Sequence, residues 1–383
     1  MAEKIVFCAD GTWNSPDKDD NDDRMPDWTN VYKLFLALDG SLAADSVREA
    51  DEQEKQLLAG GKVRQAAKYI HGVGDSRNPI VKLLGGAFGA GVIARIVRGY
   101  TFISRNYEPG AKIYITGFSR GAYTARALAG LVASQGLLAP HLTADKELAY
   151  RRGAAAWFRY RQAGLARRKS WLAKLTDVVA PDLPAFVSGD SLKPGDLIPD
   201  VPVAAVGVWD TVGALGLPAY TLGKDRIDAF RFADTRLSDK VGRGFHAIAL
   251  DERRADFAPT LWDAAPNVEQ MLFPGAHADV GGGYPAVGRE SELSDGALAW
   301  MVDRLAGEGV LFAAKPPYIP HADASGTAHR PWNKLPFKAM PKATRRFPPI
   351  PEHPSIAQRM QASPVLADPE DRMPGPYTPE NRP

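Results

Sequence analysis

The chain has 383 residues, of which 45% are hydrophobic and 24% are charged, which is typical of a soluble globular protein. Its net charge of +2 gives no electrostatic reason to expect nucleic-acid binding, so no nucleic-acid partner is predicted. The single cysteine, Cys8, excludes a disulfide within the chain. No stretch resembles a signal peptide or a membrane span, which predicts a cytoplasmic protein and leaves open export by a route that reads no N-terminal signal.

Apolar segments of strand length alternate with segments of helical periodicity along the chain. In chain order they are strand 5–9, helix 30–38, strand 67–71, helix 93–107, strand 111–116, helix 121–136, strands 203–209, 244–250 and 268–273, and helix 296–305. Residues 41–66 are polar and charged, which predicts a surface excursion. The alternation of strands and helices predicts an α/β fold built on one doubly wound, mostly parallel sheet.

Residues 137–200 differ in composition from the rest of the chain. Between Lys146 and Lys174 there are nine basic side chains and one acid, Glu147, with aromatic residues interleaved. A basic and aromatic helical insertion suits a lid or an anionic membrane surface contacted through residues 146–174. It suits equally well a helix pair docked on the core with solvated arginines, and the sequence leaves both interpretations open.

The C-terminal segment, residues 341–383, is rich in proline. Eleven of its 43 residues are proline, which disfavours regular helices and strands. We therefore predict an extended tail that is wrapped on the surface of the protein and has no core of its own.

The segment Lys112–Tyr123 carries the most specific chemical motif. An apolar, β-branched strand runs into Gly117-Phe118-Ser119-Arg120-Gly121, and a helix-forming run follows. This is the strand–turn–helix context of a nucleophile elbow. The strained turn exposes the Ser119 hydroxyl and needs neighbours without side chains. It also places the Arg120 N–H at a helix N-terminus, where it can stabilise an oxyanion.

Four predicted strands end at polar residues, namely Asp10, Ser119, Asp210 and His277. Ligands bind at the carboxyl ends of the strands in open α/β sheets, so these residues are expected to meet. Three of them follow the chain order Ser…Asp…His of α/β-hydrolases. The pattern predicts Ser119 as nucleophile, His277 as base and Asp210 as the acid that orients it, with Asp279 as the alternative acid.

The turn after the first strand is expected to supply the second oxyanion donor. Gly11 allows close approach of the backbone, so the N–H of Gly11 or of Thr12 is predicted to serve, with Asp10 in support. His277 and Asp279 could together ligate one ion, but no second histidine stands at ligand spacing. We therefore expect no metal and no other cofactor.

Motifs along the whole chain resemble those of one family. They are Asp10–Asn14, Thr29–Val31, Gly72–Gly74, Gly117–Arg126, Val208–Gly213, Asp251–Arg253, His277–Tyr284, His353–Ser355 and Tyr377–Asn381. The family is the uncharacterised α/β-hydrolase family that includes the catalytic domain of type VI secretion phospholipase (lipase) effectors. The resemblance implies a single α/β-hydrolase domain over residues 1–383. It also implies a Ser119–Asp210–His277 triad and hydrolysis of lipid esters, commonly at an acyl bond of a glycerophospholipid.

Three functions are compatible with the sequence. The first is a lipase or phospholipase A that acts on acyl esters at an anionic membrane surface. The second is a soluble esterase or depolymerase of a small or polymeric ester, with residues 137–200 as its lid. The third is a binding protein that keeps the hydrolase fold without turnover. A secreted effector would in addition bind an immunity or carrier protein.

Overall fold

The computed structural model describes residues 1–11, 27–44, 46, 52–72, 87–166, 192–212, 235–335 and 337–382. Within these residues the core is one large sheet whose strands are β1 (Ala2–Ala9), β2 (Ser41–Leu42), β3 (Glu52–Ala59), β4 (Lys62–Ile70), β5 (Lys112–Phe118), β8 (Val203–Trp209), β9 (Val241–Ala249) and β10 (Val268–Phe273). Their spatial order is β10-β9-β8-β5-β1-β4-β3-β2. The strands from β10 to β4 run parallel, and β3 and β2 extend the sheet in antiparallel pairs. The predicted doubly wound, mostly parallel sheet is confirmed.

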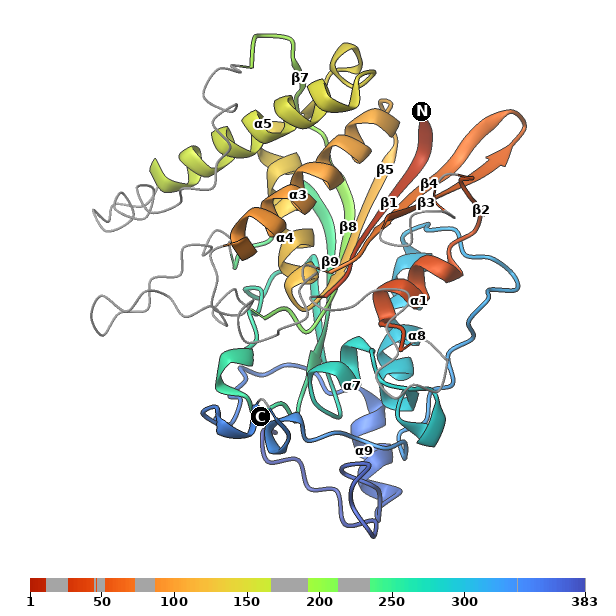
Figure 1. The fold of residues 1–383 in the computed structure, drawn as a ribbon, viewed down its shortest axis with the longest axis vertical. Helices are drawn as coiled ribbons and strands as arrows, with labels where there is room; N and C mark the ends of the chain where they lie inside the picture. Colours follow the sequence, from red (N-terminus) through yellow and green to blue (C-terminus); the bar gives the residue numbers. More distant parts are fainter. Residues whose placement is uncertain are drawn as a thin grey trace.

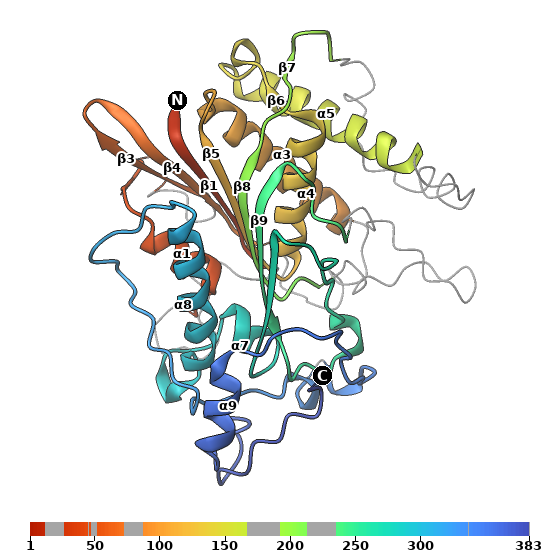
Figure 2. The same ribbon diagram turned by 180° about the vertical axis from the view of Figure 1, so that it is seen from behind.

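Helices cover both faces of this sheet (Figures 1 and 2). One face is packed by α3 (Ala87–Asn106), α4 (Arg120–Gln135) and α5 (Lys146–Ala166), and the other by α1 (Asn30–Ala37) and α8 (Glu292–Gly307). Successive side chains of β1 point to opposite faces of the sheet. Ile5 and Phe7 lie in the hydrophobic core under α3, α4 and α5, and Val6 and Cys8 lie in the core under α1 and α8. Burial on both sides explains why the strands read as continuous apolar runs.

Shorter elements connect and flank these layers. They are β6 (Leu137–Leu138) paired with β7 (Leu197–Ile198), the helices α7 (His277–Gly281) and α9 (Pro354–Gln361), and 3₁₀ turns at Pro140–Leu142, Ala255–Phe257, Val287–Arg289, Pro331–Asn333 and Phe337–Ala339. In Figure 1, α7 and the blue C-terminal segment lie below the carboxyl ends of the parallel strands.

The order of the strands reverses at β1. The chain passes from β1 to the β3–β4 hairpin on one side, returns to β5 on the other side of β1, and then continues outward through β8, β9 and β10. Such a reversal leaves a crevice at the carboxyl ends of the two central strands. Asp10 follows β1 directly and Ser119 follows β5 directly, so both lie at this reversal.

The prediction that residues 41–66 form a surface excursion is wrong, because β2, β3 and the start of β4 form the antiparallel edge of the sheet. Polar side chains occupy both faces of this edge and find partners there. Glu54 accepts hydrogen bonds from Lys68 and Arg105. The buried Lys55 donates to three backbone carbonyls around the end of α1. Because charge pairing replaces apolar burial here, the usual strand pattern is missing from the sequence.

The proline-rich C-terminal segment contains helix α9 and contributes to a third hydrophobic cluster. Ile350 and Ile356 pack there with Ile248, Leu250 and Leu272 of the sheet and its edge. The Leu272 N–H donates to the carbonyl of residue 351, and the N–H of residue 353 donates back to Leu272. The segment therefore lies along the outer edge of β10.

The described part of the insertion is docked on the core through α5. Trp157 is almost completely buried, and the Tyr160 hydroxyl reaches Gly130 of α4. Phe158 is more than a third exposed on the outer side of the helix. The rest of the predicted basic run, residues 167–174, lies outside the described residues. In the part of the chain that the structure describes, no helix has both the length and the apolar character needed to cross a membrane.

Candidate active site

Ser119 lies on a strained turn between β5 and α4. Its φ of 58° and ψ of −122° are unusual for a residue with a side chain, and its N–H donates to the Trp209 carbonyl at 3.1 Å. A Cβ on Gly117 would lie 2.3 Å from the Gly121 carbonyl oxygen. A Cβ on Gly121 would lie 2.2 Å from the Ala9 carbonyl oxygen. The two glycines of the motif are thus required by the close approach of α4 to β5 and β1.

Asp210 and His277 meet at the carboxyl ends of β8 and β10. His277 Nδ1 lies 2.5 Å from Asp210 Oδ2, and both side chains are buried. His277 is the first residue of α7, and its ring centroid lies 4.6 Å from that of Phe118, the residue before Ser119. Burial lowers the pKa of His277 and outweighs the bond to Asp210, so the ring is neutral near pH 7.

Arg345 is a member of this cluster that the sequence did not indicate. Its guanidinium donates to both carboxylate oxygens of Asp210, at 2.7 and 2.9 Å. Burial raises the pKa of the Asp210 carboxyl, but Arg345 and His277 more than offset this and hold the pKa well below its usual range. Arg345 stands in the proline-rich segment, where no local pattern distinguishes it from its exposed neighbour Arg346.

Two acids after β9 hold the turn that presents His277. Glu252 is fully buried, and its Oε2 accepts hydrogen bonds from the His277 N–H at 3.2 Å and from Arg254 at 2.7 Å. Asp251 accepts from the Gly275 N–H at 2.7 Å, and burial raises its pKa to about 6. No role at the site is predicted for these two acids from the sequence. They stand directly after a strand, the same signal that pointed to the other site residues.

Asp279, the alternative acid, is engaged with a different histidine. Its Oδ1 lies 2.6 Å from His329 Nδ1, and its Oδ2 accepts from the Ala276 N–H at 2.8 Å. His329 Nε2 lies 2.9 Å from Glu290. Burial opposes protonation of His329, but the two carboxylates outweigh it and raise the pKa of His329 to about 9. Among the described residues, no group of three or more His, Cys, Asp or Glu side chains is placed to hold a metal ion.

Asp10 organises the turn that follows β1. Its Oδ2 accepts hydrogen bonds from the Thr29 hydroxyl at 2.8 Å and the Tyr69 hydroxyl at 2.7 Å. Its Oδ1 accepts from the Gly11 N–H at 2.6 Å. Of the two predicted oxyanion donors in this turn, Gly11 is therefore bonded to Asp10, and Thr12 lies outside the described residues.

Arg120, the third predicted donor, is the first residue of α4. Backbone N–H groups at such a position point out of the helix along its axis, toward the partial positive end of the helix dipole. The N–H of Arg120 belongs to this first turn, directly beside Ser119. The elbow thus places a nucleophile and a helix N-terminus at the same point of the sheet.

Comparisons with known proteins show which family the chain belongs to. Residues 3–304 match the model of the family described as type VI secretion system (T6SS), phospholipase effector Tle1-like, catalytic domain. An uncharacterized protein of Saccharomyces cerevisiae is 26% identical over 275 residues, which cover 70% of this chain and 34% of the yeast protein.

Two solved structures also align with this chain. An uncharacterized protein from Pseudomonas aeruginosa has 20% identity and a TM-score of 0.43 over 84% of this chain and 47% of that one. The Tle1 effector bound to the VgrG spike from the type VI secretion system has 19% identity and a TM-score of 0.39, over 74% and 52%. This chain spans about a third of the yeast protein and about half of each solved chain. Because the family match runs from β1 into α8, the chain belongs to the family of Tle1-like phospholipase effector catalytic domains of type VI secretion.

Proposed function

We propose that this protein is a serine hydrolase that cleaves acyl esters of glycerophospholipids, as a phospholipase A. The observation that carries the proposal is the ring contact, with centroids 4.6 Å apart, between His277, which is paired with Asp210, and Phe118, the residue before Ser119 on its strained turn. Family membership supports a lipid substrate.

In the proposed reaction, the Ser119 hydroxyl attacks the acyl carbonyl while His277 Nε2 accepts its proton. Asp210 accepts the Nδ1–H of the ring, which fixes the tautomer and stabilises the imidazolium. The N–H groups of Arg120 and Thr12 stabilise the oxyanion of the tetrahedral intermediate. His277 then returns the proton to the leaving alcohol, and a water molecule activated by the same ring hydrolyses the acyl-enzyme.

The insertion is the part of the protein that we propose contacts the anionic membrane surface. Phe158 and Arg159 are exposed on the outer side of α5, which supports a surface that combines apolar and basic groups. We further propose that the protein leaves the cell by type VI secretion, which would need no N-terminal signal, and that it binds a carrier or immunity protein.

The test compares wild type with Ser119→Ala, using Ser134→Ala on the exposed side of α4 as the matched control. Substrates are phosphatidylglycerol vesicles, phosphatidylcholine vesicles and a short p-nitrophenyl ester, each with and without EDTA. We expect EDTA-insensitive fatty-acid release from vesicles that falls at least about 10³-fold in Ser119→Ala and is unchanged in Ser134→Ala.

Other results lead to different conclusions. Turnover of the short ester alone would support the second candidate, a soluble esterase or depolymerase that uses the same serine. Equal turnover by wild type and Ser119→Ala would contradict the proposed nucleophile. Faster release from phosphatidylglycerol than from phosphatidylcholine would support recognition of an anionic surface.

A further inference from the structure

We propose that Arg345 is a positioning residue for the Asp210–His277 pair, so that the C-terminal segment is part of the active site. The inference rests on the proposed serine hydrolase function. Arg345 lies beyond residues 3–304, the part of the chain that matches the family model. Its side chain is only 3% exposed although its neighbours in the chain, residues 341–344 and 346, are exposed.

The guanidinium fixes the Asp210 carboxylate in one orientation. Nη1 donates to Oδ1 and Nη2 to Oδ2, in the two-pronged geometry that makes arginine–carboxylate pairs directional. The same two nitrogens also donate to the carbonyls of Ala249 and Phe257, at 2.7 and 2.5 Å. With the Ala249 N–H and His277 Nδ1, the carboxylate accepts from four donor atoms and cannot rotate without breaking several bonds.

Backbone pairing holds Arg345 in place. The Ala255 N–H donates to the Pro341 carbonyl at 3.0 Å, and the Ala343 N–H donates to the Arg253 carbonyl at 2.8 Å. The chain just before Arg345 is therefore bonded to the loop that begins with Glu252, which anchors the His277 N–H. Arg345 and His277 thus take their positions from one loop.

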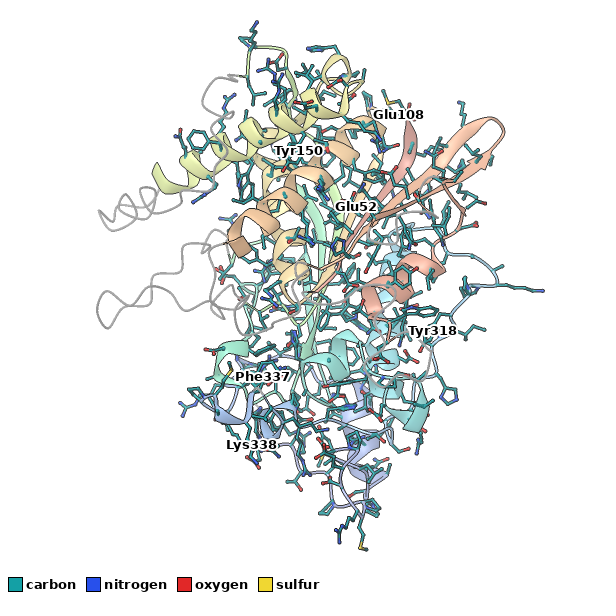
Figure 3. All side chains as sticks on the ribbon, in the orientation of Figure 1. Glu52, Glu108, Tyr150, Tyr318, Phe337 and Lys338 are labelled. Carbon is teal, nitrogen blue, oxygen red and sulfur yellow. The ribbon has the colours of Figure 1, made fainter. Side chains whose placement is uncertain are left out.

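Aromatic packing reinforces this arrangement. The Phe257 ring lies edge-on to His277, with centroids 5.0 Å apart, and edge-on to Phe337, at 5.8 Å. Phe337, labelled in Figure 3, lies just before the C-terminal segment, close to the carboxyl ends of the strands. Arg345 therefore contacts Asp210 directly, and Phe337, a few residues earlier, packs on Phe257, which contacts His277.

The arrangement also determines the electrostatics of the pair. The charged and titratable groups that interact with it are Glu252, Arg254, Arg345 and His246. Burial lowers the pKa of His246 to about 3, so this ring is neutral. Arg345 offsets the charge of Asp210, which limits how strongly that carboxylate can favour protonation of His277. Removal of Arg345 is therefore expected to make His277 more basic.

The test uses Arg345→Gln, which removes the charge, and Arg345→Lys, which keeps the charge but loses the two-pronged geometry. Arg346→Gln is the matched control, because Arg346 is the exposed neighbour. For each variant, the pH dependence of kcat/KM on a short p-nitrophenyl ester is measured, and the His277 ring is titrated by NMR. The ring signal is assigned by its loss in His277→Gln, and circular dichroism verifies folding.

For Arg345→Gln we expect kcat to fall about 10²-fold with little change in KM. Both the acidic limb of the pH profile and the ring titration should move to higher pH. In Arg345→Lys the ring titration should stay close to that of wild type, because the charge is kept. The kcat of this variant should remain lowered, because the two-pronged geometry is lost. Arg346→Gln should match wild type in all three measurements.

The inference is overturned if folded Arg345→Gln and Arg345→Lys keep the kcat, pH profile and ring titration of wild type. If Arg345→Gln does not fold, the comparison of Arg345→Lys with wild type decides, because a normal kcat in that variant overturns the geometric role. Failure of the proposed function is distinguishable from this result. If the proposed function is wrong, wild type shows no turnover that depends on Ser119, while the NMR titration of the His277 ring still reports the effect of Arg345.

Discussion

Gly121→Ala tests how closely helix α4 must approach the sheet for the Ser119 turn to form. A Cβ at this position would lie 2.2 Å from the Ala9 carbonyl oxygen and 2.4 Å from that of Asp10. Ordinary contacts between heavy atoms are about 3.5 Å, so α4 and β1 must separate by roughly 1 Å. Both obstacles are backbone atoms at the end of the central strand, so no side chain can rotate to relieve the contact.

The separation should reduce both stability and turnover. Overpacking costs about 1–3 kcal/mol in the free energy of unfolding, and we expect the upper part of this range because only backbone can move. The first turn of α4 carries the proposed Arg120 donor, so a displacement of about 1 Å should lower kcat about 10²-fold. Urea unfolding followed by circular dichroism gives the first quantity, and turnover of a short p-nitrophenyl ester gives the second.

Gly296→Ala is the matched control. Gly296 lies within α8, and a Cβ there meets no atom within 4 Å. Alanine favours a helix over glycine by up to about 1 kcal/mol, so this variant should be as stable as wild type or more stable, with normal turnover. The reasoning is refuted if Gly121→Ala unfolds at the urea concentration of wild type and turns over the ester at the same rate.

Three further predictions concern other residues of the candidate site and its surroundings. Asp210→Asn should lower kcat on the short ester about 10³- to 10⁴-fold, because an amide selects the wrong tautomer of His277, and a normal rate would disprove the assignment. The protonated His329 ring should stabilise the fold below pH 6.5, and this stabilisation should disappear as the pH rises through 9. The gap in unfolding free energy between wild type and His329→Gln should therefore shrink by about 3 kcal/mol from pH 6 to pH 10, whereas a constant gap would contradict the pairing. Gly281→Ala should displace α7, since its Cβ would meet the Phe118 ring at 1.9 Å, and kcat should fall about 10-fold or more. A rate equal to that of wild type would show that α7 tolerates the added methyl group.

Several residues of the candidate site could be proposed from the sequence because their signals are local. The glycines of the elbow are adjacent to the serine that they expose, and Asp210 and His277 each stand close after an apolar strand. The bounds predicted for two of these strands, 203–209 and 268–273, are those of β8 and β10. Parallel strands bring such ends together whatever the intervening loops contain.

What the sequence could not show depends on contacts between distant segments. Asp210 and Arg345 are 135 positions apart, and no periodicity connects them. Asp279 stands two residues after His277, and only the position of His329 determines which histidine it binds. Strand β3 was missed for a related reason, since its charged side chains find their partners on α3 and β4.

The C-terminal segment that brings Arg345 to Asp210 also shields an edge of the sheet. Residues 351–353 exchange hydrogen bonds with Leu272 along the outer side of β10. An uncovered edge strand offers peptide groups to other chains and promotes aggregation. Release of this segment would therefore remove the Arg345 guanidinium from the Asp210–His277 pair and expose an unpaired edge strand in a single event. Loss of activity and loss of solubility are thus expected to occur together when this segment detaches.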